Sequence, residues 1–529
     1  MMMRTEQITM TRTDKMRRTF PILLLLYVFL MPMQAQESTY RYDDATQLWR
    51  LTNNPAGLGI DSSRNRGFAL FNVEHQSGSY ARVQEGTQTN QLRFQTERYQ
   101  KVGKYLYGYG RFDFDYGRTK NRTWCDVMRP YNANPYFAGS SVIGKYDFQD
   151  FDFTAELGTV PFFGHGKDGN GLRFGLRLDY NVGDLSRLRD PRSRSQLLDY
   201  KVTPAVTYSF GQHTIGLSGN YHRRKEKIIG VTTVQQDPTL KYYLMSGLEN
   251  AQGTVGGYSS FSREWVDHIL EGELSYGFKN QKWNTLLSLS IARGEENAYE
   301  KYKYEPGRYV HYDYGVSLRN RLTTKKVLHQ LDLSFNYQQS YADEYRQQLH
   351  QETDAETGFT SYFYENSLTY KKRYQAHVFD ADIHYRACFL KNQQQRAYIG
   401  LRYTTDGAEN KRLLPDSKLC YGSNNITLEG GLCIIRHLWI DLWGTRHWAK
   451  DATLDLSDPT TDYAKGVLLP DMEYYQANCW RGHLQLTYEI PLKIKGKTSH
   501  WFIRAYGDYL KTNNSLDSKC AGLSIGLFN

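Results

Sequence analysis

Apolar and polar residues alternate along most of this 529-residue chain, and this period of two constrains its fold more than any other feature. Side chains of a β-strand point to opposite faces in turn, so strict alternation predicts strands with one apolar and one polar face. Unbroken examples cover residues 172–180, 331–337 and 484–492. In the last of these, the apolar residues are Leu484, Leu486, Tyr488, Ile490 and Leu492. We therefore expect an all-β fold.

The number and length of the alternating segments favour a membrane barrel. Most segments are close to the roughly 9 to 11 residues that a tilted strand needs to cross a bilayer, whereas globular strands average about 5 to 6. We count about 18 strands, with 16 possible. They are expected near residues 67–76, 90–99, 105–117, 150–158, 172–182, 200–210, 213–223, 268–278, 283–293, 309–320, 328–340, 375–387, 396–404, 424–434, 438–448, 482–492, 500–510 and 521–528.

Short and long connections alternate between these segments. The short ones include 211–212, 279–282 and 435–437, with 159–171 as an exception. The long ones are 118–149, 183–199, 224–267, 341–374 and 449–481. Outer-membrane barrels have short periplasmic turns and long extracellular loops. We therefore predict one transmembrane antiparallel β-barrel over residues 67–529, located in the cell outer membrane.

Composition excludes several other classes of protein. A mean hydropathy of −0.66 with one long apolar run excludes a bundle of membrane helices, whereas a barrel conceals its apolar face by alternation. The 43 Tyr, 24 Phe and 9 Trp suit aromatic belts. The net charge is +10, but the Lys and Arg residues are interleaved with acidic residues along the chain. We therefore expect no nucleic-acid partner. The six cysteines are widely spaced, and we expect neither a metal site nor a cofactor.

The two ends of the chain carry export features. A basic segment followed by the apolar run 20–33 predicts a signal peptide over residues 1–35, with cleavage after Ala35. Residues 36–66 then form a periplasmic leader or a hatch inside the lumen, too short for the plug of a TonB-dependent receptor. At the other end, an apolar row of three residues and the penultimate Phe528 suit contact with the barrel assembly machinery.

A short motif in the leader suggests a moving element. The run Asn54, Pro55, Ala56 and Gly57 resembles the hatch of the long-chain fatty-acid transporter family, in which the hatch sits inside the barrel and moves when a hydrophobic ligand binds. A plain turn into the first strand is the alternative. The mature chain as a whole resembles an uncharacterised family of Bacteroidetes outer-membrane barrels, and this resemblance implies the barrel without implying an activity.

Charged residues recur on the polar faces and should line the lumen. They could select solutes, or they could pair across neighbouring strands and hold the barrel in shape. The candidates are Arg111, Asp113, Arg173, Arg177, Asp179, Asp380, Asp382, His384 and Arg386. No nucleophile accompanies them, so we do not expect an enzyme. The loop from Arg187 to Arg194 should lie at the surface, where its arginines could contact lipopolysaccharide phosphates.

The expected function follows from this architecture. A barrel of about 18 strands encloses a lumen wide enough for water unless the leader and loops fill it. We predict an outer-membrane barrel that passes a small solute or serves as an accessory barrel in an uptake or secretion complex. Outer-membrane lipid and lipopolysaccharide are the expected surroundings. A surface-binding or structural barrel without transport is one alternative, and a barrel hydrolase is another.

Overall fold

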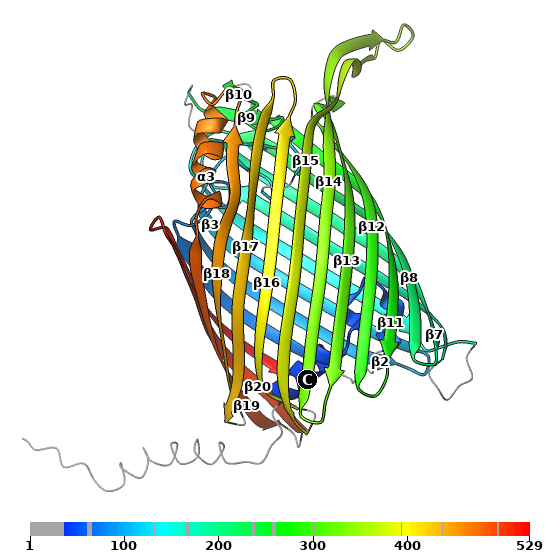
Figure 1. The fold of residues 1–529 in the computed structure, drawn as a ribbon. Coiled ribbons are helices and arrows are strands. Elements are labelled where there is room, and N and C mark those ends of the chain that lie inside the picture. Colours follow the sequence, from blue (N-terminus) through cyan, green and yellow to red (C-terminus); the bar gives the residue numbers. More distant parts are fainter. Residues whose placement is uncertain are drawn as a thin grey trace, which may run out of the picture.

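A computed structural model shows a closed antiparallel barrel of 18 strands (Figure 1). It describes residues 36–60, 66–130, 133–163, 170–234, 239–255, 261–300, 303–392, 394–435, 437–494 and 497–528, so the expected signal peptide lies outside the described residues. The barrel strands are β1 (Arg66–Gly78), β2 (Gln88–Val102), β3 (Leu106–Arg122), β5 (Gly144–Thr159), β6 (Gly171–Arg187), β7 (Arg192–Phe210), β8 (His213–Thr232), β11 (Phe261–Lys279), β12 (Trp283–Tyr299), β13 (Gly307–Thr323), β14 (Val327–Thr353), β15 (Thr360–Lys391), β16 (Gln394–Arg412), β17 (Ser417–Ile435), β18 (Leu438–Asp455), β19 (Cys479–Ile494), β20 (Lys497–Thr512) and β21 (Asp517–Phe528).

The barrel closes where its first strand meets its last. β1 pairs with β2 on one side and with β21 on the other, with Phe68 opposite Phe528 in the second pairing. Every predicted segment coincides with one of these strands, which confirms the predicted fold class. The C-terminus and the short turns share one end of the barrel, called here the turn end, and the opposite end is the loop end (Figure 1).

Two of the predicted long loops are wrong, because the strands continue past the apolar zone. The connection expected at 183–199 shrinks to 188–191, since Ser186 pairs with Arg194. The connection expected at 341–374 is mostly a hairpin, in which Tyr345 pairs with Thr369. Backbone pairing does not need apolar side chains, so alternation of hydrophobicity fades before the ladder ends. Arg187, expected at the surface, is buried against Tyr146 instead.

The two faces of the wall differ as the alternation predicts. On β6 the outer face exposes Phe174, Leu176, Leu178 and Tyr180, between 39% and 50% each. On the same strand, Arg177 points to the inside and pairs with Glu156 of β5. A belt of exposed apolar side chains with a polar interior is the pattern of a barrel in lipid. Among the described residues, no helix combines the length and the apolar character needed to cross a membrane.

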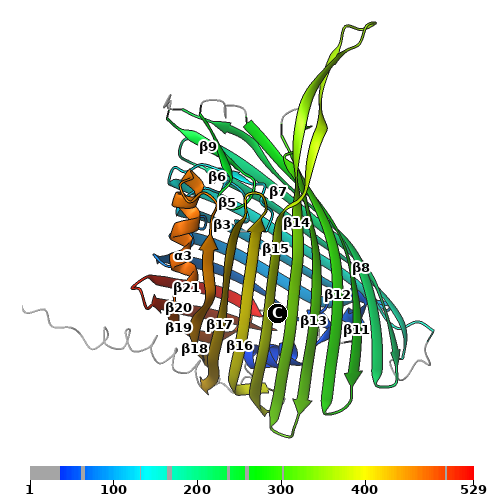
Figure 2. The ribbon, with the colours of Figure 1, turned by 45° about the horizontal axis from the view of Figure 1, so that its top comes forward.

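Two groups of residues fill the ends of the lumen. At the turn end lies the leader (residues 36–60), with α2 (Gln36–Thr46) and the 3₁₀ turns η1 (Trp49–Leu51) and η2 (Pro55–Gly59) (Figure 2). At the loop end lies the loop cap (123–130, 133–143, 239–255 and 456–478). The cap holds a small sheet of β4 (Ala138–Gly139), β9 (Lys241–Met245) and β10 (Ala251–Val255), together with the π-helix η4 (Ala464–Leu468) and α3 (Leu469–Tyr475).

Candidate functional site: a chamber between the leader and the loop cap

Helix α2 of the leader is attached to the wall by a buried ion pair. The Arg41 guanidinium donates to both carboxylate oxygens of Asp441 on β18, at 2.8 and 2.7 Å. The same guanidinium stacks on the Trp439 ring, 4.5 Å from its centroid, and donates to Glu37 one helical turn earlier at 2.8 Å. A bidentate guanidinium–carboxylate pair fixes orientation as well as distance. These contacts therefore hold α2 in one position against β18.

Side chains of the wall also donate hydrogen bonds to backbone carbonyl groups of the leader. Arg321 of β13 donates to the Ala45 carbonyl at 2.7 Å, and Arg319 of the same strand donates to the Leu51 carbonyl at 2.9 Å. Elsewhere on the wall, the Asn54 amide donates to the Val206 carbonyl of β7 at 3.2 Å. Because β7 and β18, the strand that binds Arg41, lie on opposite sides of the 18-strand barrel, the leader crosses the lumen instead of following one strand.

Inward-facing glycines of the wall make room for the leader. A Cβ at Gly216 of β8 would lie 2.9 Å from the Trp49 ring, and one at Gly277 of β11 would lie 3.0 Å from it. A Cβ at Gly158 of β5 would lie 2.9 Å from the Pro55 carbonyl oxygen. Any larger residue would displace the leader, since real Cβ atoms do not approach so closely. The wall is therefore shaped around the leader.

The four hatch candidates lie together on the inner wall. Asn54 caps η2, accepting a hydrogen bond from the Ala56 amide at 3.0 Å, and Pro55 occupies the first turn. Asn54, Pro55, Ala56 and Gly57 are all buried. The segment is thus a tight turn, as the alternative to the hatch supposed, and this turn lies inside the barrel against β5, β6 and β7. Placement alone does not establish movement.

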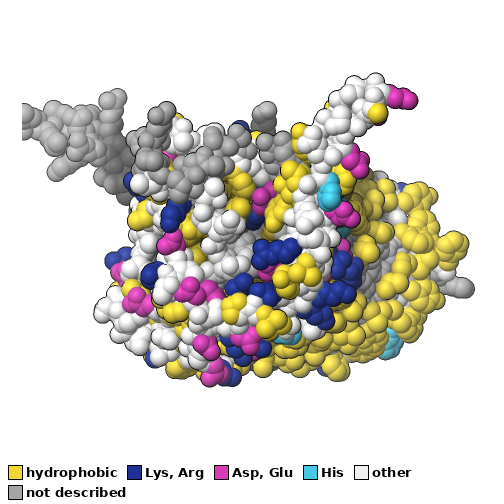
Figure 3. Space-filling view, turned by 90° about the horizontal axis from the view of Figure 1, so that it is seen from above, with side chains coloured by type: hydrophobic (Ala, Val, Ile, Leu, Met, Phe, Trp, Pro, Cys, Tyr) yellow, Lys and Arg dark blue, Asp and Glu magenta, His cyan; other side chains and the backbone are white. Residues whose placement is uncertain are grey.

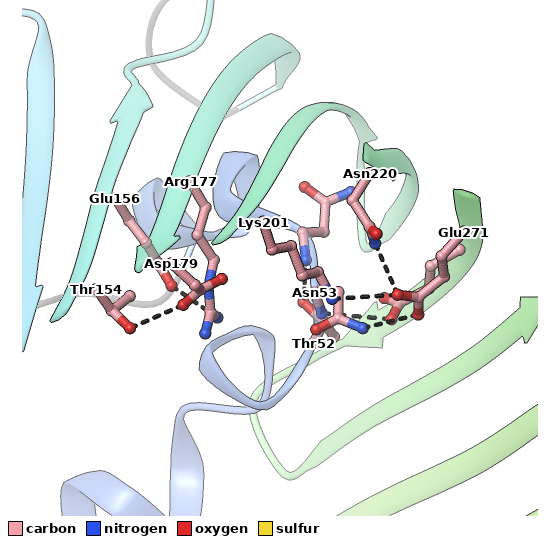
Figure 4. A network of polar contacts seen from close by, with 11 residues as sticks. Thr52, Asn53, Thr154, Glu156, Arg177, Asp179, Lys201, Asn220 and Glu271 are labelled. Atoms are coloured by element: carbon pink, nitrogen blue, oxygen red, sulfur yellow. Dashed lines mark hydrogen bonds and ion pairs between the residues drawn. The ribbon is translucent and has the colours of Figure 1, made fainter. Parts of the chain in front are cut away.

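A polar network joins the leader to side chains of the barrel wall (Figure 4). Glu271 of β11 accepts from the Asn53 amide at 3.2 Å and from the Asn220 amide at 2.7 Å, and it pairs with Lys201 at 3.1 Å. The leader is therefore joined to β7, β8 and β11 through one carboxylate. Polar contacts of this kind can exchange with water more readily than apolar packing when a segment moves.

The lumen candidates form separate wall clusters. Arg111 pairs with Asp113, and Arg173 donates to the Ser209 hydroxyl at 2.7 Å. Arg177 pairs with Asp179 at 2.7 Å (Figure 4). On the other side of the barrel, Asp380 accepts from the Asn336 amide at 2.9 Å, and Asp382 pairs with Arg402. His384 and Arg386 share Glu429, at 2.8 and 2.7 Å. Five of these seven pairs join different strands, three of them neighbours and two reaching from β15 to β17, so the residues connect the wall.

The loop cap packs through aromatic residues into the barrel mouth. The Trp265 indole of β11 donates to the Tyr136 carbonyl, and the Tyr136 hydroxyl donates to the Asp343 carbonyl of β14 at 2.6 Å. Cys125 is buried in the same cluster, and burial raises the pKa of its thiol. All six cysteines are free thiols. The cap is thus a packed layer fixed to the wall at β11 and β14.

A cavity of about 390 Å³ lies between the cap and the wall. One part of its lining is polar: Arg224 pairs with Glu296 at 3.0 Å, and the His311 ring lies 3.4 Å from a carboxylate oxygen of Asp267. The other Asp267 oxygen is buried and has no hydrogen-bond partner within the described part of the chain. The opposite lining is apolar, with residues such as Leu248 and Val467. This chamber suits a small amphipathic molecule.

Sequence analysis did not predict the chamber, nor the space that four inward-facing glycines leave for the leader. We call this space, beside Gly158, Gly175, Gly216 and Gly277, the glycine slot. The chamber's residues come from eight strands and four connections between strands, and no local pattern connects them. The slot could have been detected, since Gly158, Gly175, Gly216 and Gly277 replace polar residues on the inner face of four strands. Glycine inside a strand often marks a place where another backbone or ring approaches closely.

Comparisons with known proteins identify a family of unknown function and several solved barrels that the chain resembles. A family model described as a family of unknown function (DUF6850) matches residues 55–529. No curated protein matches the sequence. A similar solved structure is the FrpB iron transporter of Neisseria meningitidis (F5-1 variant, apoprotein form), with a TM-score of 0.40 and 9% identity over 90% of this chain and 83% of that chain. Another is the siderophore receptor PirA of Acinetobacter baumannii, with a TM-score of 0.37 and 8% identity over 88% and 81%.

Proposed function

Because this chain belongs to the DUF6850 family, whose function is unknown, we propose from its geometry that it is an outer-membrane barrel that passes a small solute. The closed ladder of 18 strands and the exposed apolar belt support the location. In that orientation the turn end faces the periplasm and the loop end faces the cell exterior. The leader is then the gate at the periplasmic side, and the loop cap narrows the outer mouth without closing it.

The leader's mode of attachment carries this proposal. It is bound through ion pairs such as that between Arg41 and Asp441, hydrogen bonds and the packing of Trp49, and it contributes no strand to the barrel. The wall remains a complete ladder without it. A segment attached in this way can leave as a unit, whereas a wall strand cannot. The resemblance of its central turn to a hatch fits the same role.

The chamber suggests what kind of solute would pass. The carboxylate residues Asp267 and Glu296 line the chamber together with apolar residues, so a bound solute should offer a hydrogen-bond donor beside an apolar part. A volume of about 390 Å³ is at the lower end for ligand pockets, which usually span about 300 to 1,000 Å³. We therefore propose small amphipathic molecules, such as those carrying an amine, as the class of solute.

Solute uptake into liposomes tests this function. Full-length protein and a form lacking residues 36–60 would be refolded into separate vesicles, and swelling would be followed in amines and sugars of increasing size. We expect slow swelling with the full chain and at least tenfold faster swelling without the leader. Asp267→Asn in the shortened form should slow the entry of amines more than that of sugars. Equal, background swelling from both forms would contradict a role in passage.

A further inference from the structure

The hairpin of β14 and β15 extends well beyond the rest of the barrel wall (Figures 1 and 2). Pairing of β14 with β13 ends at Glu344, and pairing of β15 with β16 ends at Tyr374. Beyond these points, the strand pairing of residues 347–353 is with residues 360–366 alone among the described residues. We call residues 345–372 the arm. Both of its edges offer unpaired backbone groups, which favour the addition of another strand.

The outer part of the arm has an unusual composition. Residues 347–370 contain four acidic residues and no Lys or Arg, in a chain whose net charge is +10. The acidic residues are Glu352, Asp354, Glu356 and Glu365. Figure 3 shows acidic side chains toward the tip of the arm and Lys and Arg side chains gathered below it. The arm therefore presents a localised negative charge away from the body of the protein.

The arm also exposes large apolar side chains. Phe359 at the tip is 71% exposed, and Leu349, Tyr362, Phe363 and Leu368 are exposed as well. A two-stranded hairpin alone is only marginally stable in water, so such a ribbon gains from additional contacts. Exposed apolar residues gathered on one element mark an interaction surface more often than a solvated loop.

The base of the arm is braced, so it does not fold back on the barrel mouth. Two register shifts interrupt the β14–β15 ladder, between Ala342 and Glu344 and between Arg346 and Gln347. Such bulges bend and twist a ribbon. Tyr304 of the β12–β13 connection packs edge-on against Tyr364 of the arm, with centroids 5.1 Å apart. The arm is thus positioned to meet a partner outside the mouth.

We propose that the arm docks a protein partner by accepting a basic extended segment on the free edge of β15. The edge supplies backbone hydrogen bonds, and the acidic side chains favour Lys or Arg on the added strand. A phosphate-bearing lipid surface would repel these carboxylates, and so would the arm of a second copy of this chain. This inference uses the outer-membrane orientation proposed above and does not depend on solute passage.

Peptide binding to the full-length protein in detergent tests the docking. The probe is a fluorescent ten-residue peptide in which Lys alternates with Val and Thr, and its affinity is measured by anisotropy. We expect Glu352→Lys with Glu365→Lys to weaken binding at least tenfold. Asp451→Lys, an exposed charge reversal on β18 away from the arm, should leave the affinity unchanged. A peptide with N-methylated backbone amides should bind at least tenfold more weakly than the probe.

Two controls keep the test decisive. A variant in which Asn-Gly replaces residues 347–370 should keep the heat-modifiable gel mobility of a folded barrel and lose the binding. Equal affinity of the probe for this variant, or of the N-methylated peptide for the wild type, would overturn the proposal. Sedimentation showing an arm-dependent dimer of the wild type would overturn it as well, because a second copy would then be the occupant.

Discussion

At the scale of single residues, the fit between leader and wall depends on which side chains are missing as much as on those present. Trp49 occupies a slot that exists because Gly216 and Gly277 have no Cβ. Arg41, in contrast, is held by a side chain that is present, because its guanidinium pairs with the Asp441 carboxylate of the wall. The first type of contact excludes other positions of the leader, and the second stabilises the observed one.

Removal of the Asp441 carboxylate should loosen the leader without unfolding the barrel. In Asp441→Ala, the Arg41 guanidinium keeps Glu37 and loses its bidentate partner, a loss of about 1.5 to 3 kcal/mol. Hydrogen exchange of residues 36–60 should therefore accelerate by about 10- to 100-fold, as each 1.4 kcal/mol is about tenfold. Asp382→Ala, which breaks a wall pair with Arg402, is the matched control and should leave that exchange unchanged. Equal effects of the two variants would contradict the assignment.

At the scale of elements, the sequence predicted the strand boundaries at the turn end far better than those at the loop end. Alternation located all 18 strands because the outer face of the wall carries a belt of apolar side chains, as on β6 and β19. Beyond this belt the outer face is not apolar, and so β14 and β15 continue through polar residues without a signal. The small sheet of β4, β9 and β10 and the path of the leader depend on contacts between distant segments, which no local pattern encodes.

The loop cap should open when its aromatic anchor is removed. Tyr136→Ala deletes a buried ring and its hydrogen bond to the Asp343 carbonyl, a change on the order of 3 to 5 kcal/mol. Cys125 should then become accessible, and its thiol pKa should fall as burial is relieved. Maleimide labelling at pH 7, read by mass spectrometry at each cysteine, should rise at least tenfold at Cys125 and stay low at the wall residue Cys388. Unchanged labelling of Cys125 would show that the cap is anchored elsewhere.

At the scale of the whole molecule, the barrel and its contents are separable. The wall closes through β1 and β21, so its hydrogen-bond ladder needs neither the leader nor the cap. The leader, in turn, is enclosed by strands from most of the circumference. The barrel wall can therefore stay folded while the leader moves, as the proposed gated passage requires.

Deletion of residues 36–60 should therefore leave a folded barrel. We expect the shortened protein to keep its heat-modifiable gel mobility and a single cooperative unfolding transition, because the wall ladder is complete without the leader. Complete loss of the folded band would instead mean that the leader is part of the barrel's structural core.

Single-channel conductance in planar bilayers tests the central claim, that the leader closes the turn end by fitting the glycine slot. Gly216→Val combined with Gly277→Val fills the slot from the wall and leaves every leader residue intact. Gly219→Val adds the same side chain to the other face of β8, where a Cβ meets nothing closer than 3.8 Å. We predict long openings in the double variant, matching those of the protein without residues 36–60, and a closed state for Gly219→Val and the wild type. A closed double variant beside an open leader deletion would contradict the slot as the element that holds the gate.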